Sequence, residues 1–285
     1  MGAIDFILNL VGLLLWLSWR SMRFDPLVKS SPVTLIGTLK RAESRRLRGW
    51  QVAVVLGAIV SLRAVLYWII GAPADWTPKL NLEFVVLAFR SDSFRSMCVF
   101  SCLSFARALV VLYFWLATLT IINRSTIEAD PVQKLVRLHL GTMASWPWPV
   151  QLLLPYLATL ALWIGVEPLL VNLGVMTPVH STAHLFGQAS LVGLGLVLSL
   201  KYVLPIFLCL HLIASYIYLG TSPVWNFIAT TSTHVTAPLR LLPLRFARLD
   251  FTPLAGAVLI LALLHWLPNA ILNRIAASQW STWPQ

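Results

Sequence analysis

Long apolar runs separated by shorter polar segments set the pattern of this chain. Six of these runs are close to the length of a membrane crossing, near residues 4–21, 50–71, 101–122, 149–171, 198–219 and 251–272. A helix needs about 20 apolar residues to cross a hydrocarbon core about 30 Å thick. The pattern therefore predicts six transmembrane helices.

Two apolar stretches, residues 83–122 and 184–219, are longer than one crossing requires. The turns within them are too short for an extra crossing, so we expect a helix in or near the membrane plane, followed by a span. In EFVVLAFRSDSFR, residues 83–95, charges are interspersed among Phe, Leu and Val, as in an interfacial helix. The predicted fold is an all-α membrane protein with interfacial helices before spans three and five.

The chain also contains a repeated unit. Each of three polar loops begins with Asp or Ser followed by proline, at Pro26, Pro131 and Pro223. Asp or Ser at the N-cap, with Pro in the first turn, favours the start of a helix. Each loop is thus expected to begin with a short surface helix, which gives three tandem helical hairpins. The units are residues 1–72, 83–171 and 184–272, followed by a tail at 273–285.

Composition supports the membrane assignment and gives an orientation. The chain is 58% hydrophobic and 11% charged, whereas soluble domains carry about 25% charged residues. Its net charge is +11, and fourteen Lys and Arg residues lie in segments 20–49, 123–148 and 220–250, against four in the alternate segments. This bias places the three basic loops in the cytoplasm and both termini outside. It explains the charge without direct binding of nucleic acid.

The third basic loop carries prolines and arginines between two spans. Pro238 and Pro243 interrupt any continuous helix. Each loop arginine could gain about 1 kcal/mol from anionic lipid at the cytoplasmic face. An equally simple interpretation is that the arginines only enforce topology. At the end of the loop, Asp250 is expected to be the N-cap of the last span, with Phe251 at its first position.

The stretch SPVWNFIATTSTHVTAPLRLLPLRFARLDFTPLAGAVLILALL resembles the signature of the YggT family, also called YlmG. The signature elements are a Ser-Pro start, a basic-proline core, a DFSP-like tetrapeptide and a closing apolar helix. They correspond to Ser222-Pro223, to Pro238, Leu239, Arg240, Pro243 and Arg245, and to the tetrapeptide from Asp250 to Pro253. Two departures are Ala247-Arg248 in place of a Gly pair and an altered Arg-Pro step.

The resemblance is specific over residues 204–272, weak over 107–171 and weaker over 4–71. It implies an integral protein of the bacterial cytoplasmic membrane. It also implies a role near cell division or nucleoid organisation, in support of cofactor assembly, or in tolerance of osmotic stress. The candidate partner- or lipid-binding residues are Pro223, Pro238, Arg240, Pro243, Arg245 and Arg248, and Asp250 and Pro253 are interpreted as structural.

Four charged residues fall within or beside the apolar runs, and such residues are functional candidates by default. Arg63 lies about 20 Å along its helix from Trp50 and could snorkel outward. Arg107 and Lys201 are expected to mark the outer start of spans three and five. Glu167 could pair with one of these three cations across the bundle.

The sequence gives little sign of chemistry. Cys98, Cys102 and Cys209 lie in apolar runs and are interpreted as packing residues. His180 and His184 have the i, i+4 spacing of a metal pair but no third ligand nearby, so no metal site or cofactor is predicted. No nucleophile elbow, phosphate loop or HExxH motif occurs, and we do not expect an enzyme.

Two functions remain as hypotheses. The first is a non-catalytic scaffold or assembly factor whose cytoplasmic loops bind membrane lipids and a membrane or membrane-associated protein. The second is a transport or channel component, suggested by the tandem units and the intramembrane charges. The units all begin outside and are parallel, unlike the inverted repeats common in transporters.

Overall fold

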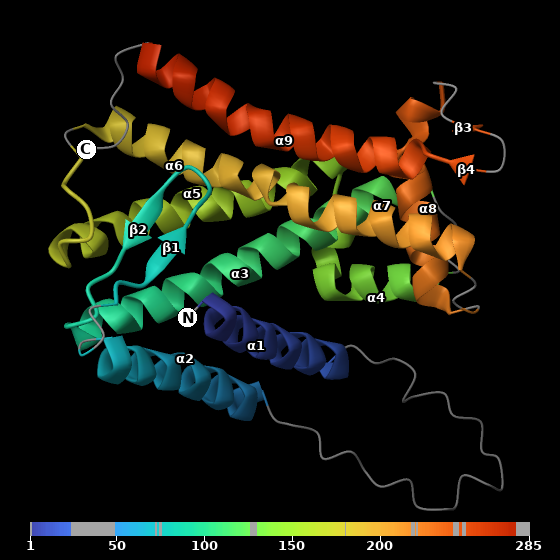
Figure 1. Ribbon diagram of the computed structural model, residues 1–285. Coiled ribbons are helices and arrows are strands. Elements are labelled where there is room, and N and C mark those ends of the chain that lie inside the picture. Colours follow the sequence, from blue (N-terminus) through green and yellow to red (C-terminus); the bar gives the residue numbers. More distant parts are fainter. Residues whose placement is uncertain are drawn as a thin grey trace, which may run out of the picture. The chain divides into compact units, whose positions relative to one another are not determined.

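A computed structural model describes the chain from residue 2 to residue 277, with gaps at 24–48, 72, 74–75, 126–129, 180, 218–219, 221, 242–244 and 247–248. The structure is mostly helical. Its long helices are α1 (Gly2–Arg23), α2 (Gly49–Gly71), α3 (Phe94–Ile122), α5 (Trp148–Asn172), α6 (Thr182–Leu198), α7 (Leu200–Tyr216) and α9 (Thr252–Ala277). Its shorter elements are β1 (Lys79–Asn81), β2 (Val86–Ala88), α4 (Pro131–Leu140), η3 (Gly141–Ser145), α8 (Pro223–Val235), η4 (Ala237–Leu241), β3 (Arg245–Phe246) and β4 (Leu249–Asp250) (Figure 1).

In the part of the chain that the structure describes, each predicted span overlaps a helix. Within the described residues, five helical segments are long and apolar enough to cross a membrane: Gly49–Gly71, Phe94–Ile122, Trp148–Asn172, Thr182–Tyr216 and Thr252–Ile275. The chain is therefore a multi-pass membrane protein. Helix α1 covers the first predicted span, but its crossing of the membrane stays a prediction. The same holds for the arrangement in hairpins, for the orientation and for the outer location of both termini.

The chain forms two compact units. The first comprises Met1–Pro78 and Phe89–Leu109, and the second comprises Lys79–Ala88 and Val110–Gln285. These boundaries differ from those of the three tandem units that the sequence predicts. The first part of α3 belongs to the first unit and its second part to the second unit.

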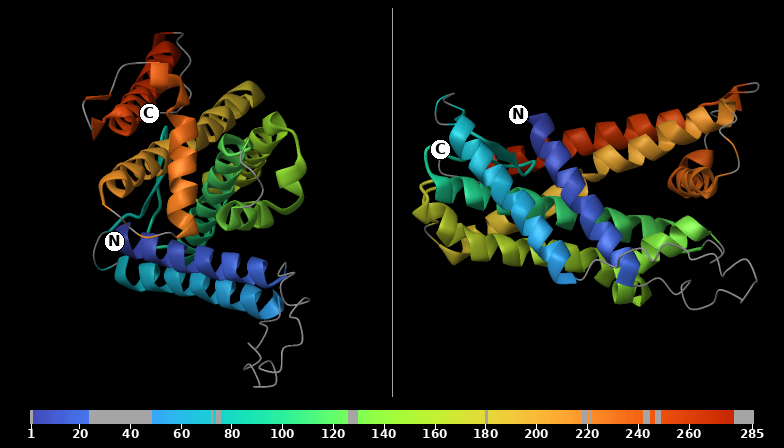
Figure 2. Two further views of the ribbon diagram at one scale, coloured as in Figure 1. Left: turned by 90° about the vertical axis from the view of Figure 1, so that its right-hand side faces the viewer. Right: turned by 90° about the horizontal axis from the view of Figure 1, so that it is seen from below.

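The first unit is built from α1, α2 and the start of α3. Helices α1 and α2 lie side by side (Figure 2). Gly12 lets α1 approach α3 closely, because a Cβ at this position would lie 2.7 Å from the ring of Phe105. A cluster of aromatic rings also fills the core of this unit. Tyr67 packs edge-on against Trp76 and also packs against Phe100.

In the second unit, α6 packs along α5, α7 packs along α9, and α8 packs against α7. A buried apolar cluster joins the end of α3 to α4 and α8. Its members are Ala117, Leu119, Val136, Leu140 and Phe227. The two surface helices are thereby part of the core of this unit and not loose appendages.

The predicted interfacial helix at residues 83–95 is wrong. Strands β1 and β2 form an antiparallel hairpin in which Leu80 pairs with Leu87. Both leucines are buried while their strand neighbours are exposed, which is the alternation of buried and exposed side chains that defines a β-strand. The sequence interpretation overlooked this alternation. The hairpin turns at Asn81, whose Oδ1 accepts a hydrogen bond from the backbone N–H of Glu83 (2.8 Å).

The second predicted interfacial segment is helical. Helix α6 continues into α7 through Ser199, whose backbone is itself helical at φ −64° and ψ −18°. Together they make a segment of 35 residues, which is about 50 Å long at about 1.5 Å per residue. This exceeds one crossing of about 30 Å. Whether α6 lies in the membrane plane stays a prediction.

Candidate functional site: paired surface helices and intramembrane polar clusters

Two surface helices begin as the sequence predicts. The Asp130 carboxylate accepts a hydrogen bond from the backbone N–H of Val132 (2.9 Å) at the start of α4, and Pro131 follows the cap. The Ser222 hydroxyl accepts one from Val224 (3.4 Å) at the start of α8, where Pro223 follows. The corresponding Asp-Pro step at Pro26 lies outside the described residues.

A buried polar joint fastens both helices to the end of α3. Asn123 Nδ2 donates to Thr231 Oγ1 on α8 (2.7 Å), and Gln133 Nε2 on α4 donates to the backbone carbonyl of Asn123 (2.6 Å). His234 Nδ1, also on α8, lies 3.3 Å from Asn123 Oδ1. Asn123, Gln133 and Thr231 are 2% exposed or less. Since buried polar groups are costly when unpaired, these bonds fix α4 and α8 relative to each other.

The outward surface of the pair mixes charge and apolar area. On α4, Lys134 is exposed and Leu135 is 49% exposed. On α8, Pro223 and Asn226 are exposed and Val224 is 50% exposed. Such a surface suits contact with lipid headgroups or with another protein.

The third loop is described in part. Pro238 is exposed within η4, and the backbones of Arg240 and Arg245 lie in η4 and β3. Pro243, Arg248 and the side chains of all the loop arginines lie outside the described residues. Strands β3 and β4 pair in antiparallel fashion, with Phe246 opposite Leu249. The described part of the loop therefore contains a short hairpin that the sequence interpretation did not predict.

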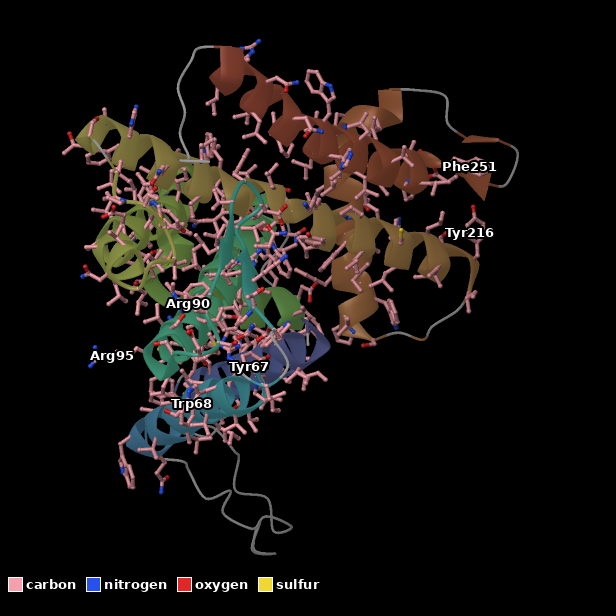
Figure 3. The ribbon with its side chains drawn as sticks, turned by 60° about the vertical axis from the view of Figure 1, so that its left-hand side comes forward. Tyr67, Trp68, Arg90, Arg95, Tyr216 and Phe251 are labelled. Atoms are coloured by element: carbon pink, nitrogen blue, oxygen red, sulfur yellow. The ribbon has the colours of Figure 1, made fainter. Side chains whose placement is uncertain are left out.

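Asp250 was predicted at the N-cap of the last helix, but it lies one residue before the N-cap. It belongs to β4, and its carboxylate accepts a hydrogen bond from the backbone N–H of Thr252 (2.9 Å). Phe251 occupies the N-cap position, because its carbonyl accepts the first helical bond, from Ala255 (2.9 Å). Tyr216, at the end of α7, accepts a bond from the backbone N–H of Asp250 (3.2 Å), and Figure 3 shows Tyr216 and Phe251 at the same end of this unit.

Pro253 follows within the first turn of α9, where a proline is tolerated. Asp250 thus has the predicted partner type, a backbone amide of the last span, although the helix begins one residue later. Short polar side chains just outside a helix can bond its first amides from more than one position. The sequence therefore predicts the position of the cap to within one residue and no better.

Arg63 does not snorkel. It is 2% exposed within α2 of the first unit. Its Nε donates to Ser101 Oγ (2.8 Å), its Nη1 donates to Asn9 Oδ1 (2.9 Å) and its Nη2 donates to the backbone carbonyl of Ser101. Nη1 also lies 3.4 Å from Ser104 Oγ. The guanidinium therefore bridges α1 and α3 from its place on α2.

A carboxylate completes this cluster. Asp5 Oδ1 lies 3.7 Å from Arg63 Nη1 and accepts a hydrogen bond from the Tyr67 hydroxyl (2.7 Å). Sequence reasoning overlooked Asp5, Asn9, Ser101 and Ser104. A signal was present, because Asp5 and Asn9 are four residues apart, Ser101 and Ser104 are three apart, and each pair shares a helix face within an apolar run.

Lys201 has a partner that the sequence did not suggest. Its Nζ lies 2.5 Å from Glu83 Oε2, at the turn of the β1–β2 hairpin. The sequence left open a pairing of Glu167 with Arg63, Arg107 or Lys201, but Asp5 and Glu83 supply the carboxylates beside Arg63 and Lys201. Within the described residues Glu167 forms no ion pair.

Arg107 lies inside α3, about 20 Å along the helix from Phe94 at about 1.5 Å per residue. Lys201 lies one residue after the start of α7. Their predicted place at the outer start of spans three and five stays a prediction. Among the described side chains, no group of three or more His, Cys, Asp or Glu could hold a metal ion. His180 lies outside the described residues.

Comparison of the chain with models of protein families, with curated proteins and with solved structures finds no match. The resemblance to the YggT family therefore rests on the residues quoted above, chiefly those of segment 204–272.

Proposed function

We propose that this protein is a non-catalytic membrane scaffold or assembly factor of the YggT type, and that α4, α8 and the third loop form its cytoplasmic binding face. The observation that carries the proposal is the joint at Asn123. It holds two short helices, which begin after different spans, in one fixed arrangement.

A fixed surface suits a scaffold because less conformational freedom is lost when a partner binds. Short helices in connecting segments would otherwise fray, since isolated helices of this length are marginal in water. Here the apolar cluster and the Asn123 joint supply the missing stability. The exposed Lys134 and the arginines of the third loop favour an acidic partner, either anionic lipid or a membrane-associated protein.

The experiment uses the full-length protein in nanodiscs that contain neutral and anionic lipid, with retained lipid counted by native mass spectrometry. Arg240, Arg245 and Arg248 are replaced by Gln singly and together. Graded losses of about 1 kcal/mol for each arginine, removed by high salt, mean anionic lipid. Loss of a co-purified protein on replacement of one arginine means a protein partner with a hot spot.

Asn123→Ala is the second variant, because it leaves every basic residue in place and removes the bond from the Asn123 side chain to Thr231 on α8. The scaffold proposal expects weaker capture of the lipid or partner by this variant. Unchanged capture by both Asn123→Ala and the triple Gln variant would overturn it.

The alternative is a transport or channel component, favoured by the buried Arg63 cluster, since charges inside membrane helices often mark pathways. Its guanidinium already donates to Asn9 and Ser101 and lies near Asp5. These internal partners occupy donors of the guanidinium that a transported species would otherwise bind. This function therefore ranks second. Flux of ions into liposomes that contain the purified protein, abolished by Arg63→Met, would favour transport.

A further inference from the structure

The β1–β2 hairpin is the largest non-helical element described in the second unit, and it docks on the segment formed by α6 and α7 (Figure 1). Its buried face carries Leu80 (5% exposed) and Leu87 (4% exposed). Non-helical backbone is tolerated beside membrane helices only when protein covers it or water reaches it. Three features show that the docking is specific.

The first feature is a glycine in α6 where the hairpin turn makes contact. A Cβ added at Gly195 would lie 2.8 Å from the backbone carbonyl oxygen of Leu82. Backbone atoms cannot move aside as the end of a flexible side chain can. Any larger residue at this position would therefore push the turn away from the helix.

The second feature is backbone strain at the turn. Glu83 has φ of 70°, and it is the only non-glycine residue with positive φ in the described part of the chain. Residues in such sparsely populated regions persist when their surroundings hold them there. Here the side chain of Asn81 bonds the Glu83 amide, and the Leu82 amide donates to the carbonyl of Val85 (2.7 Å).

The third feature is the ion pair to which the strained residue belongs. Glu83 Oε2 lies 2.5 Å from Lys201 Nζ, and the Tyr202 hydroxyl donates to Glu83 Oε1 (3.3 Å). The carboxylate side chain is 9% exposed and the lysine side chain 25% exposed. Lys201 is the one Lys or Arg within the Thr182–Tyr216 segment. An ammonium group inside such a segment is costly unless it is paired.

We propose that the β1–β2 hairpin is a conformational latch on the α6–α7 segment, closed by the Glu83–Lys201 ion pair. The closed form stores the strained turn at Glu83 and compensates the charge of Lys201. Breaking the pair releases the strain and lifts the turn from Gly195, which uncovers Leu87. The latch is independent of the scaffold function, because none of its residues belongs to α4, α8 or the third loop.

The test measures how fast a maleimide labels a cysteine placed at Leu87, in full-length protein in nanodiscs whose three native cysteines are replaced by serine. Glu83→Gln and Lys201→Met should each raise the labelling rate by about tenfold or more, because each leaves a partly buried charge without its partner. The charge-exchanged pair E83K with K201E should label more slowly than either single variant. Arg90→Gln is the matched control, because it breaks an exposed ion pair with Asp92 and should leave the rate unchanged.

A second probe separates opening of the latch from unfolding. A cysteine at Leu191, which is 5% exposed on α6, should stay protected when the latch opens. If a charge variant exposes this probe as well, Gly195→Ala decides, since it displaces the turn without changing any charge. Labelling of the Leu87 probe at the parental rate in Glu83→Gln, or in Gly195→Ala with Leu191 protected, overturns the proposal.

Discussion

Replacing Arg63 by methionine should markedly destabilise the first unit. Methionine keeps most of the volume of the arginine stem but removes every donor. Ser101 and Asn9 would lose their bonds to the guanidinium, and Asp5 would lose a nearby positive charge. The Tyr67 hydroxyl would still donate to Asp5, so the carboxylate is not left wholly uncompensated.

The magnitude follows from three hydrogen bonds, to Ser101 Oγ, to the Ser101 carbonyl and to Asn9 Oδ1. Bonds between membrane helices average about 0.6 kcal/mol and reach about 1.7 kcal/mol, so three of them contribute about 2 to 5 kcal/mol. Removing one member of a buried charge pair costs about 3 to 5 kcal/mol. We expect Arg63→Met to lower the free energy of unfolding by about 3 kcal/mol.

The assay is reversible unfolding in mixtures of mild detergent and dodecyl sulfate, followed by maleimide labelling of a cysteine at Met97, which is fully buried in the first unit. Arg63→Lys should recover less than half of the loss, because one ammonium cannot span the positions of Ser101 and Asn9 as a planar fork can. Arg90→Gln, whose side chain is 72% exposed, should change the free energy by less than about 0.5 kcal/mol. A midpoint for Arg63→Met equal to that of Arg90→Gln would refute the reasoning.

The remaining predictions concern topology, a helix end and a surface carboxylate. Cysteines placed at Ser125 and Ser278 should be labelled from opposite sides of the membrane, with Ser125 reached from the cytoplasm; labelling of Ser125 only from outside would refute the orientation. Asp250→Ala should destabilise by about 1 kcal/mol in a thermal-aggregation assay, whereas Asn should be nearly silent because its oxygen can also accept from the next helix amide. The Arg90 guanidinium donates to the Asp92 carboxylate and lowers its pKa below the usual value. A titration by nuclear magnetic resonance should therefore show a higher pKa of Asp92 in Arg90→Gln.

Much of the helical fold could be predicted from the sequence because it depends on local features. Apolar runs of sufficient length predicted every long helix, since lipid offers no other partner for the backbone. Asp130 and Ser222 predicted the starts of α4 and α8 because capping and proline act within one turn. The start of the last helix shifted by one residue, because Asp250 caps it from the position before the N-cap.

The β1–β2 hairpin was not predicted because its strands are too short for a clear two-residue period. Only Leu80 and Leu87 mark the buried face, and the surrounding Phe and Val residues match an interfacial helix equally well. What selects the hairpin lies far along the chain, at Gly195 and Lys201. A pattern read within a short window contains no information about such partners.

The same limit explains why the partners of the charged residues were not predicted. A sequence shows that Arg63 and Lys201 need compensation, but it does not show which side chain comes near. The structure meets that need in two ways. Arg63 is held mainly by neutral oxygens fixed on neighbouring helices, an arrangement that can be broken only by separating the helices. Lys201 is compensated by one carboxylate on a strained turn, which can leave while every helix stays in place. The first cluster is therefore suited to hold a unit together, and the second is suited to open and close.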